Sequence, residues 1–445
     1  MAADVLVRGT GRLALAALLV LALALPLRAQ VMLRDAELER AMRELARPVI
    51  AASGLSPAQI RLVLLQDSRP NAFVVDARSV FITSGLFLKM ERPEMLQAVI
   101  AHEIAHIANG HITRRASNMR NARTAAMLGL ALSAAVASES PAAAAGIAMG
   151  SSASAQRRFF AHTRAEEIAA DQSGLRYMAQ ANVDPMAMAE VLEIFAGQEM
   201  LSAARQDPYV RTHPLSRDRI RAVEGFAAAF AEADAADPNA AYWFARGRAK
   251  LSAYIRAPSW TLRRIDGGDS SDAALVARAV AHSQNADGAR ARAAAEALVA
   301  KRPEDAYAHE LLGWVLFEAR AWDAAARAYE AAAALAPSEP LIAAGHGRAL
   351  LARGDEARAL EVLEAARARD PFNPGLLRDL AQAQARMGDE GAASLSTAER
   401  YALAGRLQEA AIHAKRASGL LPRGSTRWRR AQDIVNAAET QDRRN

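Results

Sequence analysis

A regular spacing of 34 residues in the second half of the sequence restricts the fold of that half more than any other feature. Three prolines, Pro303, Pro337 and Pro371, follow one another at this spacing. It is the length of a tetratricopeptide repeat, a pair of antiparallel helices that buries its apolar face by stacking on the next pair. We therefore expect residues 236–445 to form an α-solenoid of such repeats. A generic helical bundle, the alternative, has no reason to keep this period.

Small residues recur at matching places within the period. Residues 310–337 and 341–371 are two clear copies, and residues 272–303 are a degenerate one. The matching small residues are Gly313, Ala325 and Ala332 in the first copy, and Gly347, Ala359 and Ala366 in the second. A last copy ends at Pro422. Because Pro422 follows Pro371 by one and a half periods, we expect an extra helix to interrupt the array.

The first half contains H-E-x-x-H at His102, Glu103 and His106, within an apolar segment predicted to be helical. Residues four apart share a helix face, so both imidazoles can bind one ion. Zinc accepts such ligands, and a neighbouring carboxylate can take a proton from zinc-bound water. The alternative is a chance match on a core helix, where two buried imidazoles without partners would be costly. We expect a zinc-dependent peptidase site, with one Zn²⁺ per chain and Glu103 as general base.

A third metal ligand must come from elsewhere, and it cannot be cysteine, because the 445-residue sequence has none. A later helical segment opens with Glu166, Glu167 and Asp171. Glu167 and Asp171 share a helix face, so Glu167 can bind the metal while Asp171 accepts the second N–H of a ligand histidine. Glu166 competes with Glu167 for the ligand role. Acidic residues in a first helical turn also occur because they complement the helix dipole.

Two further candidates lie in a loop-like segment, His213 and Arg219. A loop histidine with a nearby arginine can bind an oxyanion or occupy the metal in a resting state. The alternative is a solvated histidine without a role.

Short strands are expected at residues 60–65 and 72–83, just before the metal-binding helix, with a turn at Asp76–Ser79. A helix is expected at residues 33–49, ended by Pro48. Hydrophobic residues make up 52% of the chain but aromatic residues only 5%, which favours small-residue helix contacts over sheet. The predicted fold is therefore mainly α, with a small sheet in the first domain.

Residues 1–29 are expected to be a cleavable signal peptide. Arg8 and Arg12 precede an apolar run, Leu13–Leu25, and a small residue stands before Gln30. The alternative is an uncleaved membrane anchor. The apolar run is short for that, because a membrane span needs about 20 residues. The expected location is the periplasm, if the source is a Gram-negative bacterium.

An Ala-, Gly-, Met- and Ser-rich segment, residues 124–154, is expected to be a lid or helical hairpin within a metallopeptidase domain spanning residues 30–235. The alternative, a membrane hairpin, needs longer apolar halves than Ser138–Pro141 leaves, so at most peripheral membrane contact is expected. The net charge of +6 is scattered along the chain rather than gathered in a patch. We therefore expect no nucleic-acid partner.

Four motifs, in order, resemble the zinc metallopeptidase family that includes the CAAX prenyl-protein proteases and the membrane protease HtpX. They are Asn71-Ala72-Phe73, HEIAHIANGH at residues 102–111, TRAEEIAAD at residues 163–171 and THPLSRDRI at residues 212–220. The family pattern has serine in place of Thr163 and a second glutamate in place of Ala169. It tends to have a Gly-Gly hairpin where this chain has residues 76–79.

This resemblance covers about residues 32–230 and implies a gluzincin-type α+β domain with endopeptidase activity. It makes Glu167 the zinc ligand, Asp171 its supporting carboxylate, and His213 and Arg219 neighbours of the active site. Substrate binding is expected at Asn71, Ala72 and Phe73, since an edge strand can hold an extended peptide.

The added repeats resemble the BepA-like periplasmic branch, in which the histidine matching His213 is implicated in latency. That branch implies an exported endopeptidase with a chaperone-like repeat domain. Its expected partners are misassembled outer-membrane β-barrel proteins and, through the repeats, their assembly machinery. The alternative is a scaffold or chaperone whose zinc site is latent or structural.

Overall fold

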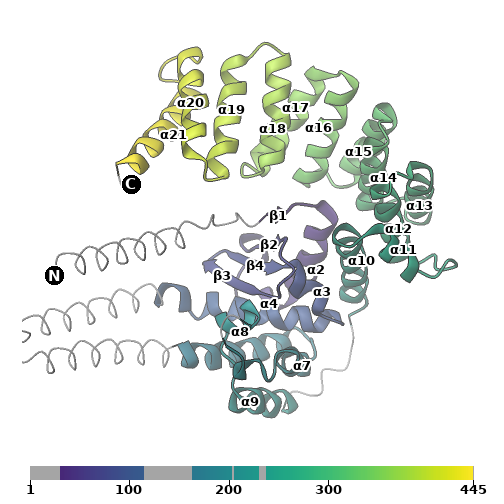
Figure 1. The fold of residues 1–445 in the computed structure, drawn as a ribbon, viewed down its shortest axis with the longest axis vertical. Helices are drawn as coiled ribbons and strands as arrows, with labels where there is room; N and C mark the ends of the chain where they lie inside the picture. Colours follow the sequence, from purple (N-terminus) through teal and green to yellow (C-terminus); the bar gives the residue numbers. More distant parts are fainter. Residues whose placement is uncertain (1–30, 115–162, 203–204, 230–236, 444–445) are drawn as a thin grey trace, which may run out of the picture. The chain divides into compact units, whose positions relative to one another are not determined.

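Two kinds of structure follow one another along the chain: a sheet with covering helices up to residue 229, and helices alone from residue 237 onward (Figure 1). The computed structural model describes residues 31–114, 163–202, 205–229 and 237–443. Met32–Asn445 forms one unit. The predicted signal peptide, the predicted lid or helical hairpin and the predicted domain boundary at residues 235 and 236 lie outside the described residues. The prediction of a mainly helical fold with a small sheet is confirmed.

The sheet has four strands in the order β1-β2-β4-β3. The strands are β1 (Met32–Leu33), β2 (Arg61–Leu65), β3 (Ala72–Asp76) and β4 (Ser79–Thr83). β2 runs parallel to β4, whereas β3 and β4 form the expected antiparallel hairpin. Because β3 is the last strand, one side of its backbone faces away from the sheet.

Helices cover this sheet and form the interior of the first part. They are α2 (Ala36–Ala52), α3 (Ser84–Lys89), α4 (Pro93–Ala108), a helix at residues 163–180, α7 (Met186–Ile194), α8 (Pro208–Thr212) and α9 (Arg217–Ala228), with short 3₁₀ turns at Pro57–Gln59 and Gln198–Met200. Side chains cap several starts: Asp35 accepts from the N–H of Leu38, and Ser216 from that of Arg219. None of the helices in the described ranges is long and apolar enough to cross a membrane.

The expected end of the first helix at Pro48 is wrong, since α2 continues to Ala52 with Pro48 inside it. A proline within a helix removes one backbone hydrogen bond. Here the residues that follow, Val49 and Ile50, are buried in the core, and their packing offsets that loss.

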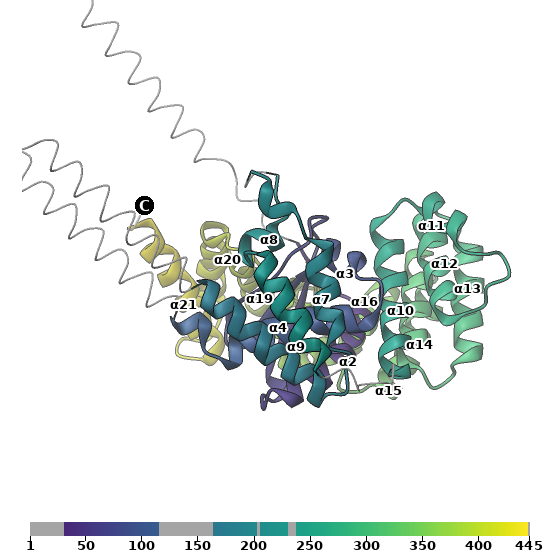
Figure 2. The ribbon, with the colours of Figure 1, turned by 90° about the horizontal axis from the view of Figure 1, so that it is seen from below.

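The metal-binding helix of the sequence, α4, lies in the centre of this part. It packs against β3 and α2 on one side and α7 on the other, and α9 follows beyond α7 (Figures 1 and 2). Leu96, Ile100 and Ile104 are fully buried, and so is almost every residue from Pro93 to His106. A helix that is apolar on all sides belongs in a core, so its polar residues need partners inside the protein.

The second part consists of helices that stack in pairs. They are α10 (Pro238–Ile255), α11 (Pro258–Arg264), α12 (Asp272–Gln284), α13 (Gly288–Lys301), α14 (Ala306–Glu318), α15 (Trp322–Leu335), α16 (Pro340–Arg353), α17 (Glu356–Arg369), α18 (Pro374–Arg386), α19 (Glu390–Leu403), α20 (Leu407–Leu420) and α21 (Thr426–Asp442). Gly347 shows why small residues recur: a side-chain Cβ there would lie 2.5 Å from Cγ of Leu363 on the partner helix. The predicted helix pairs are confirmed.

The expected extra helix in the array is wrong. The first helices of four pairs begin at Asp272, Ala306, Pro340 and Pro374, which keeps the 34-residue period, and α20 continues it as the first helix of another pair. Pro422 lies between the two helices of that pair, whereas the earlier prolines lie between pairs. The segment between Pro371 and Pro422 therefore contains three regular helices, α18, α19 and α20, and no inserted helix.

Candidate metal centre

The two histidines of the H-E-x-x-H segment lie one turn apart on α4 and face the same point. His102 and His106 are 2% and 1% exposed, and their Nε2 atoms are 3.1 Å apart. The helix at residues 163–180 adds the carboxylate of Glu167. Its Oε2 is 3.3 Å from Nε2 of His102, and its Oε1 is 3.4 Å from Nε2 of His106. Glu167, not its competitor Glu166, belongs to this cluster.

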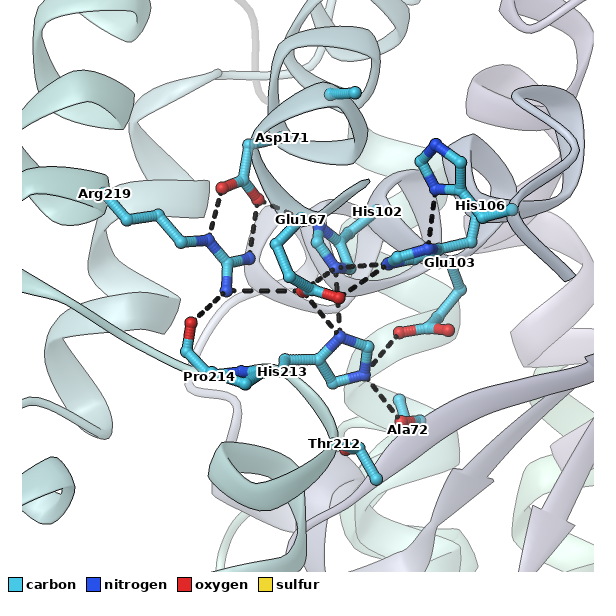
Figure 3. A network of polar contacts seen from close by, with 12 residues as sticks. Ala72, His102, Glu103, His106, Glu167, Asp171, Thr212, His213, Pro214 and Arg219 are labelled. Atoms are coloured by element: carbon cyan, nitrogen blue, oxygen red, sulfur yellow. Dashed lines mark hydrogen bonds and ion pairs between the residues drawn. The ribbon is translucent and has the colours of Figure 1, made fainter. Parts of the chain in front are cut away.

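A third imidazole, from His213 at the end of α8, joins the cluster (Figure 3). Its Nδ1 is 3.2 Å from Nε2 of His102 and 3.0 Å from Oε2 of Glu167. Four ligands about 2.0–2.1 Å from one ion at the corners of a tetrahedron lie about 3.3–3.4 Å from one another. The distances given above, 3.0–3.4 Å, are close to that spacing, and all four donor atoms lie within 4.8 Å of one another, so the residues fit a divalent metal ion.

The hydrogen bonds of His213 define which of its nitrogens faces the cluster. Nε2 lies 3.2 Å from Oε1 of Glu103 and 3.2 Å from the carbonyl oxygen of Ala72 in β3. Both neighbours are acceptors, so Nε2 carries the proton. Nδ1 then directs a lone pair at the cluster, which is the form that a metal ligand requires.

The ligand histidine His102 is held from behind by Asp171, as the sequence predicted for this carboxylate (Figure 3). Nδ1 of His102 lies 2.9 Å from Oδ1 of Asp171. Arg219 lies in the first turn of α9 and donates through Nε and Nη2 to the two oxygens of Asp171 and through Nη1 to the carbonyl oxygen of Pro214. Its Nη1 also lies 3.3 Å from Oε2 of Glu167, so one guanidinium positions both carboxylates.

The charges of the cluster keep both carboxylates ionised. Burial raises the pKa of Asp171 and Glu167, but the neighbouring side chains outweigh this effect. Arg219 lowers the pKa of Asp171, and His213 and His102 lower that of Glu167 well below its ordinary value. For His102, burial lowers the pKa, but Asp171 and Glu167 raise it to about 9. The site therefore attracts positive charge, as a metal site must.

One residue of the site was missed from the sequence: His111, which is 2% exposed. Its Nδ1 lies 2.9 Å from Nδ1 of His106, so it holds the second ligand histidine as Asp171 holds the first. His111 lies beyond the end of α4, after Gly110, whose φ of +68° turns the chain back toward the site. The signal was a further histidine five residues after His106 in a chain with only nine.

The three predicted substrate-binding residues differ in whether they contact the cluster. Ala72 contacts His213 through its carbonyl oxygen, and Oδ1 of Asn71 accepts a hydrogen bond from Oγ1 of Thr212, beside His213. Phe73 instead stacks on Phe81 of β4, with ring centroids 5.2 Å apart. The structure thus brings Asn71 and Ala72 to the cluster, while the ring of Phe73 packs within the sheet.

Comparison with known proteins gives relatives for this region. Over 43% of the chain it is 31% identical to the putative beta-barrel assembly-enhancing protease of Vibrio cholerae, of which the match covers 39%. It is 25% identical to the beta-barrel assembly-enhancing protease of Escherichia coli, covering 42% of this chain and 39% of that protein. It is also 30% identical to the mitochondrial metalloendopeptidase OMA1 of Schizosaccharomyces pombe, covering 40% and 49%. The chain thus spans less than half the length of these relatives.

Among solved structures, YrrB, described as a TPR protein with an unusual peptide-binding site, matches 39% of this chain and 91% of its own with a TM-score of 0.32 and 17% identity. A MamA structure matches 37% and 97%, with a TM-score of 0.31 and 18% identity. Residues 32–227 match the model of Peptidase family M48. This range contains the buried cluster of His102, His106 and Glu167, so the candidate metal centre lies in the part of the chain that is similar to Peptidase family M48.

Proposed function

We propose that this chain is a zinc-dependent endopeptidase whose active site is held in a latent state by His213. The observation that carries the proposal is the convergence of three donors at ligand spacing, with Glu103 on the same helical turn. His102, His106 and Glu167 would hold the ion. Two imidazoles and a carboxylate suit zinc, which keeps a further position open in catalytic sites.

The residues around the ion divide the chemistry between them. Zinc, when bound, lowers the pKa of a water molecule toward about 7 and polarises a peptide carbonyl. Glu103 takes the proton of the attacking water and passes it to the leaving amine. Asp171 and His111 fix the orientation of the two ligand imidazoles, and Arg219 fixes Asp171.

The edge strand β3 is the proposed place for the substrate backbone. An extended peptide beside β3 would donate an N–H to the carbonyl oxygen of Ala72, with Asn71 and Phe73 flanking that contact. In the resting arrangement, His213 donates to this carbonyl oxygen and places Nδ1 at the position a water molecule would need. One imidazole therefore blocks both the water and the substrate, which is the physical basis of the proposed latency.

Replacing His213 with alanine is expected to raise the cleavage rate of an unfolded protein such as casein. If His213 leaves about one molecule in ten competent, its removal raises the apparent rate about tenfold, because activity scales with the competent fraction. The initial rate measures this at fixed zinc concentration, with His309→Ala as a matched change at a partly exposed histidine on α14. An unchanged or lower rate for His213→Ala would count against latency.

Replacing His111 with phenylalanine is expected to weaken zinc binding about 10–100-fold, because His106 loses the partner that orients it. Competition with a chromogenic chelator measures the affinity without any need for activity. His111→Gln, whose side-chain amide offers both a donor and an acceptor, should lose less. Equal affinity in the phenylalanine variant and the wild type would show that His111 only fills space.

For the cellular role, we propose an exported enzyme that acts in the periplasm on misassembled outer-membrane β-barrel proteins. The names of the Vibrio and Escherichia relatives support this, as does the apolar run expected to be a signal peptide at residues 1–29. The repeats of residues 236–445 would hold unfolded clients or the β-barrel assembly machinery, while residues 30–235 would form the peptidase domain. A scaffold with a permanently latent site is the second candidate, favoured by the position of His213.

A further inference from the structure

A pocket of about 500 Å³ between α10, α11 and α12 is lined by three arginines that have no use in the proposed peptidase chemistry. They are Arg248, Arg256 and Arg264, and none of them forms an ion pair with a carboxylate in the part of the chain that the structure describes. Arg246, also on α10, is bound by Glu37 and Asp305. The pocket thus contains positive charge that the described residues leave unpaired.

Trp260 holds two of these guanidinium groups in place. The Cζ atoms of Arg256 and Arg264 lie 4.1 Å and 4.2 Å from the centroid of its ring. Arg256 follows the end of α10 and Arg264 ends α11, so the ring of Trp260 brings arginines from two segments together at the pocket. Stacking on a ring leaves the N–H edges of a guanidinium available, and those edges bind carboxylates in pairs.

Two buried polar atoms in the same pocket also lack a hydrogen-bond partner among the described residues. They are Nε of Arg248 and Oγ1 of Thr261, a residue that is 5% exposed. The Arg248 side chain is held by one bond, from Nη2 to the carbonyl oxygen of Leu88 at 3.3 Å. Buried polar atoms are nearly always paired, so an unpaired donor beside free guanidinium groups points to a ligand.

The charge balance narrows the class of ligand. Two acidic residues also line the pocket, Glu91 and Asp269, and Asp269 is already engaged as the acceptor of the Ser271 N–H at 2.8 Å. Three positive and two negative side chains leave about one net positive charge, which suits a group with one negative charge better than a phosphate with two.

The remaining walls are apolar, from Leu88, Phe244 and Ile265. We propose that this pocket binds the free C-terminal carboxylate of an extended peptide whose last side chain is apolar. The guanidinium groups would take the carboxylate, and the apolar walls would take the side chain. The pocket is separate from the metal centre. It would therefore bind the C-terminus of a polypeptide whether or not that polypeptide is cleaved.

Fluorescence anisotropy tests the proposal with the full chain carrying Glu103→Gln, which prevents cleavage of the probe. The probe is a fluorescein-labelled peptide, Gly-Ser-Gly-Ser-Leu-Phe, with either a free or an amidated C-terminus. We expect the free acid to bind at least about tenfold more tightly than the amide, and Arg264→Gln or Arg256→Gln to remove most of that difference. Arg263→Gln, an exposed neighbour outside the pocket, is the matched control and should change nothing.

Equal binding of acid and amide would overturn the proposal, as would an equal loss of binding in Arg263→Gln. So would acid-selective binding that Arg264→Gln and Arg256→Gln leave intact, because the probe would then occupy another site, such as the metal centre. Displacement of the probe by inorganic phosphate at concentrations where acetate has no effect would mean a phosphate site instead.

Discussion

The Glu103→Gln variant is expected to cleave an unfolded protein about 10²–10⁴-fold more slowly than the wild type while keeping its zinc. Glutamine has the shape of glutamate but cannot accept the proton of the attacking water. Glu103 is fully buried beside the cluster of metal-ligating atoms without belonging to it, so the metal should remain bound. Initial cleavage rates measure the expected loss of activity, and the zinc content of the same preparation shows whether the metal is retained.

Glu94→Gln provides a matched control, because Glu94 lies on the same helix at its first turn and pairs with Arg92 rather than with the site. It should cleave as the wild type does. Retained cleavage in Glu103→Gln would contradict the assigned role of Glu103. In cells, a Glu103→Gln strain that behaves like the wild type would favour the scaffold over the peptidase.

The Arg246→Met variant is expected to lose about 3–5 kcal/mol of unfolding free energy, because the buried carboxylate of Glu37 loses its nearer cationic partner and keeps only Lys250, at 3.3 Å. Arg246 is 1% exposed, and its Nε lies 2.5 Å from Oε1 of Glu37, which is fully buried at the start of α2. It also contacts Asp305, before α14. Lys250, one turn further along α10, lies 2.8 Å from Asp35. These ion pairs join α2, in the first part of the chain, to the first repeats through α10.

Urea unfolding followed by circular dichroism measures this loss, with Arg358→Met as the control. Arg358 pairs with Glu330 on the repeats, but both side chains are about half exposed. Such a pair contributes about 0–1 kcal/mol, so its loss should shift the midpoint little. Equal, small shifts in both variants would mean that the buried pairs at α10 do not hold the two parts together.

The sequence predicted the centre of the site well, because H-E-x-x-H carries its own geometry. Residues four apart on a helix face one point, and this spacing alone brings His102 and His106 together. Glu166 remained a competitor of Glu167, the predicted ligand, since adjacent residues point in different directions and only the packing of the second helix selects one. The sequence pattern did not predict a role for His111, because this residue lies past the helix end, where no helical period relates it to His106.

The fold, too, was predicted where local sequence determines it and was missed where distant contacts do. The 34-residue period reflects helix pairs that contact only their neighbours, so local sequence determined most of the array. A single proline is weaker evidence: Pro48 lies inside α2, and Pro422 lies within a pair rather than after one. The pairing of Glu37 with Arg246 could not be foreseen, because charged residues 209 positions apart resemble any solvated helix face.

The most direct test of the metal centre is an anomalous difference map, recorded at the zinc absorption edge, from crystals of the zinc-loaded chain. We predict one peak per chain, about 2.0–2.1 Å from Nε2 of His102, Nε2 of His106 and a carboxylate oxygen of Glu167. A map with no peak at that point, or with zinc bound only elsewhere, would contradict the assignment of these residues as the metal centre.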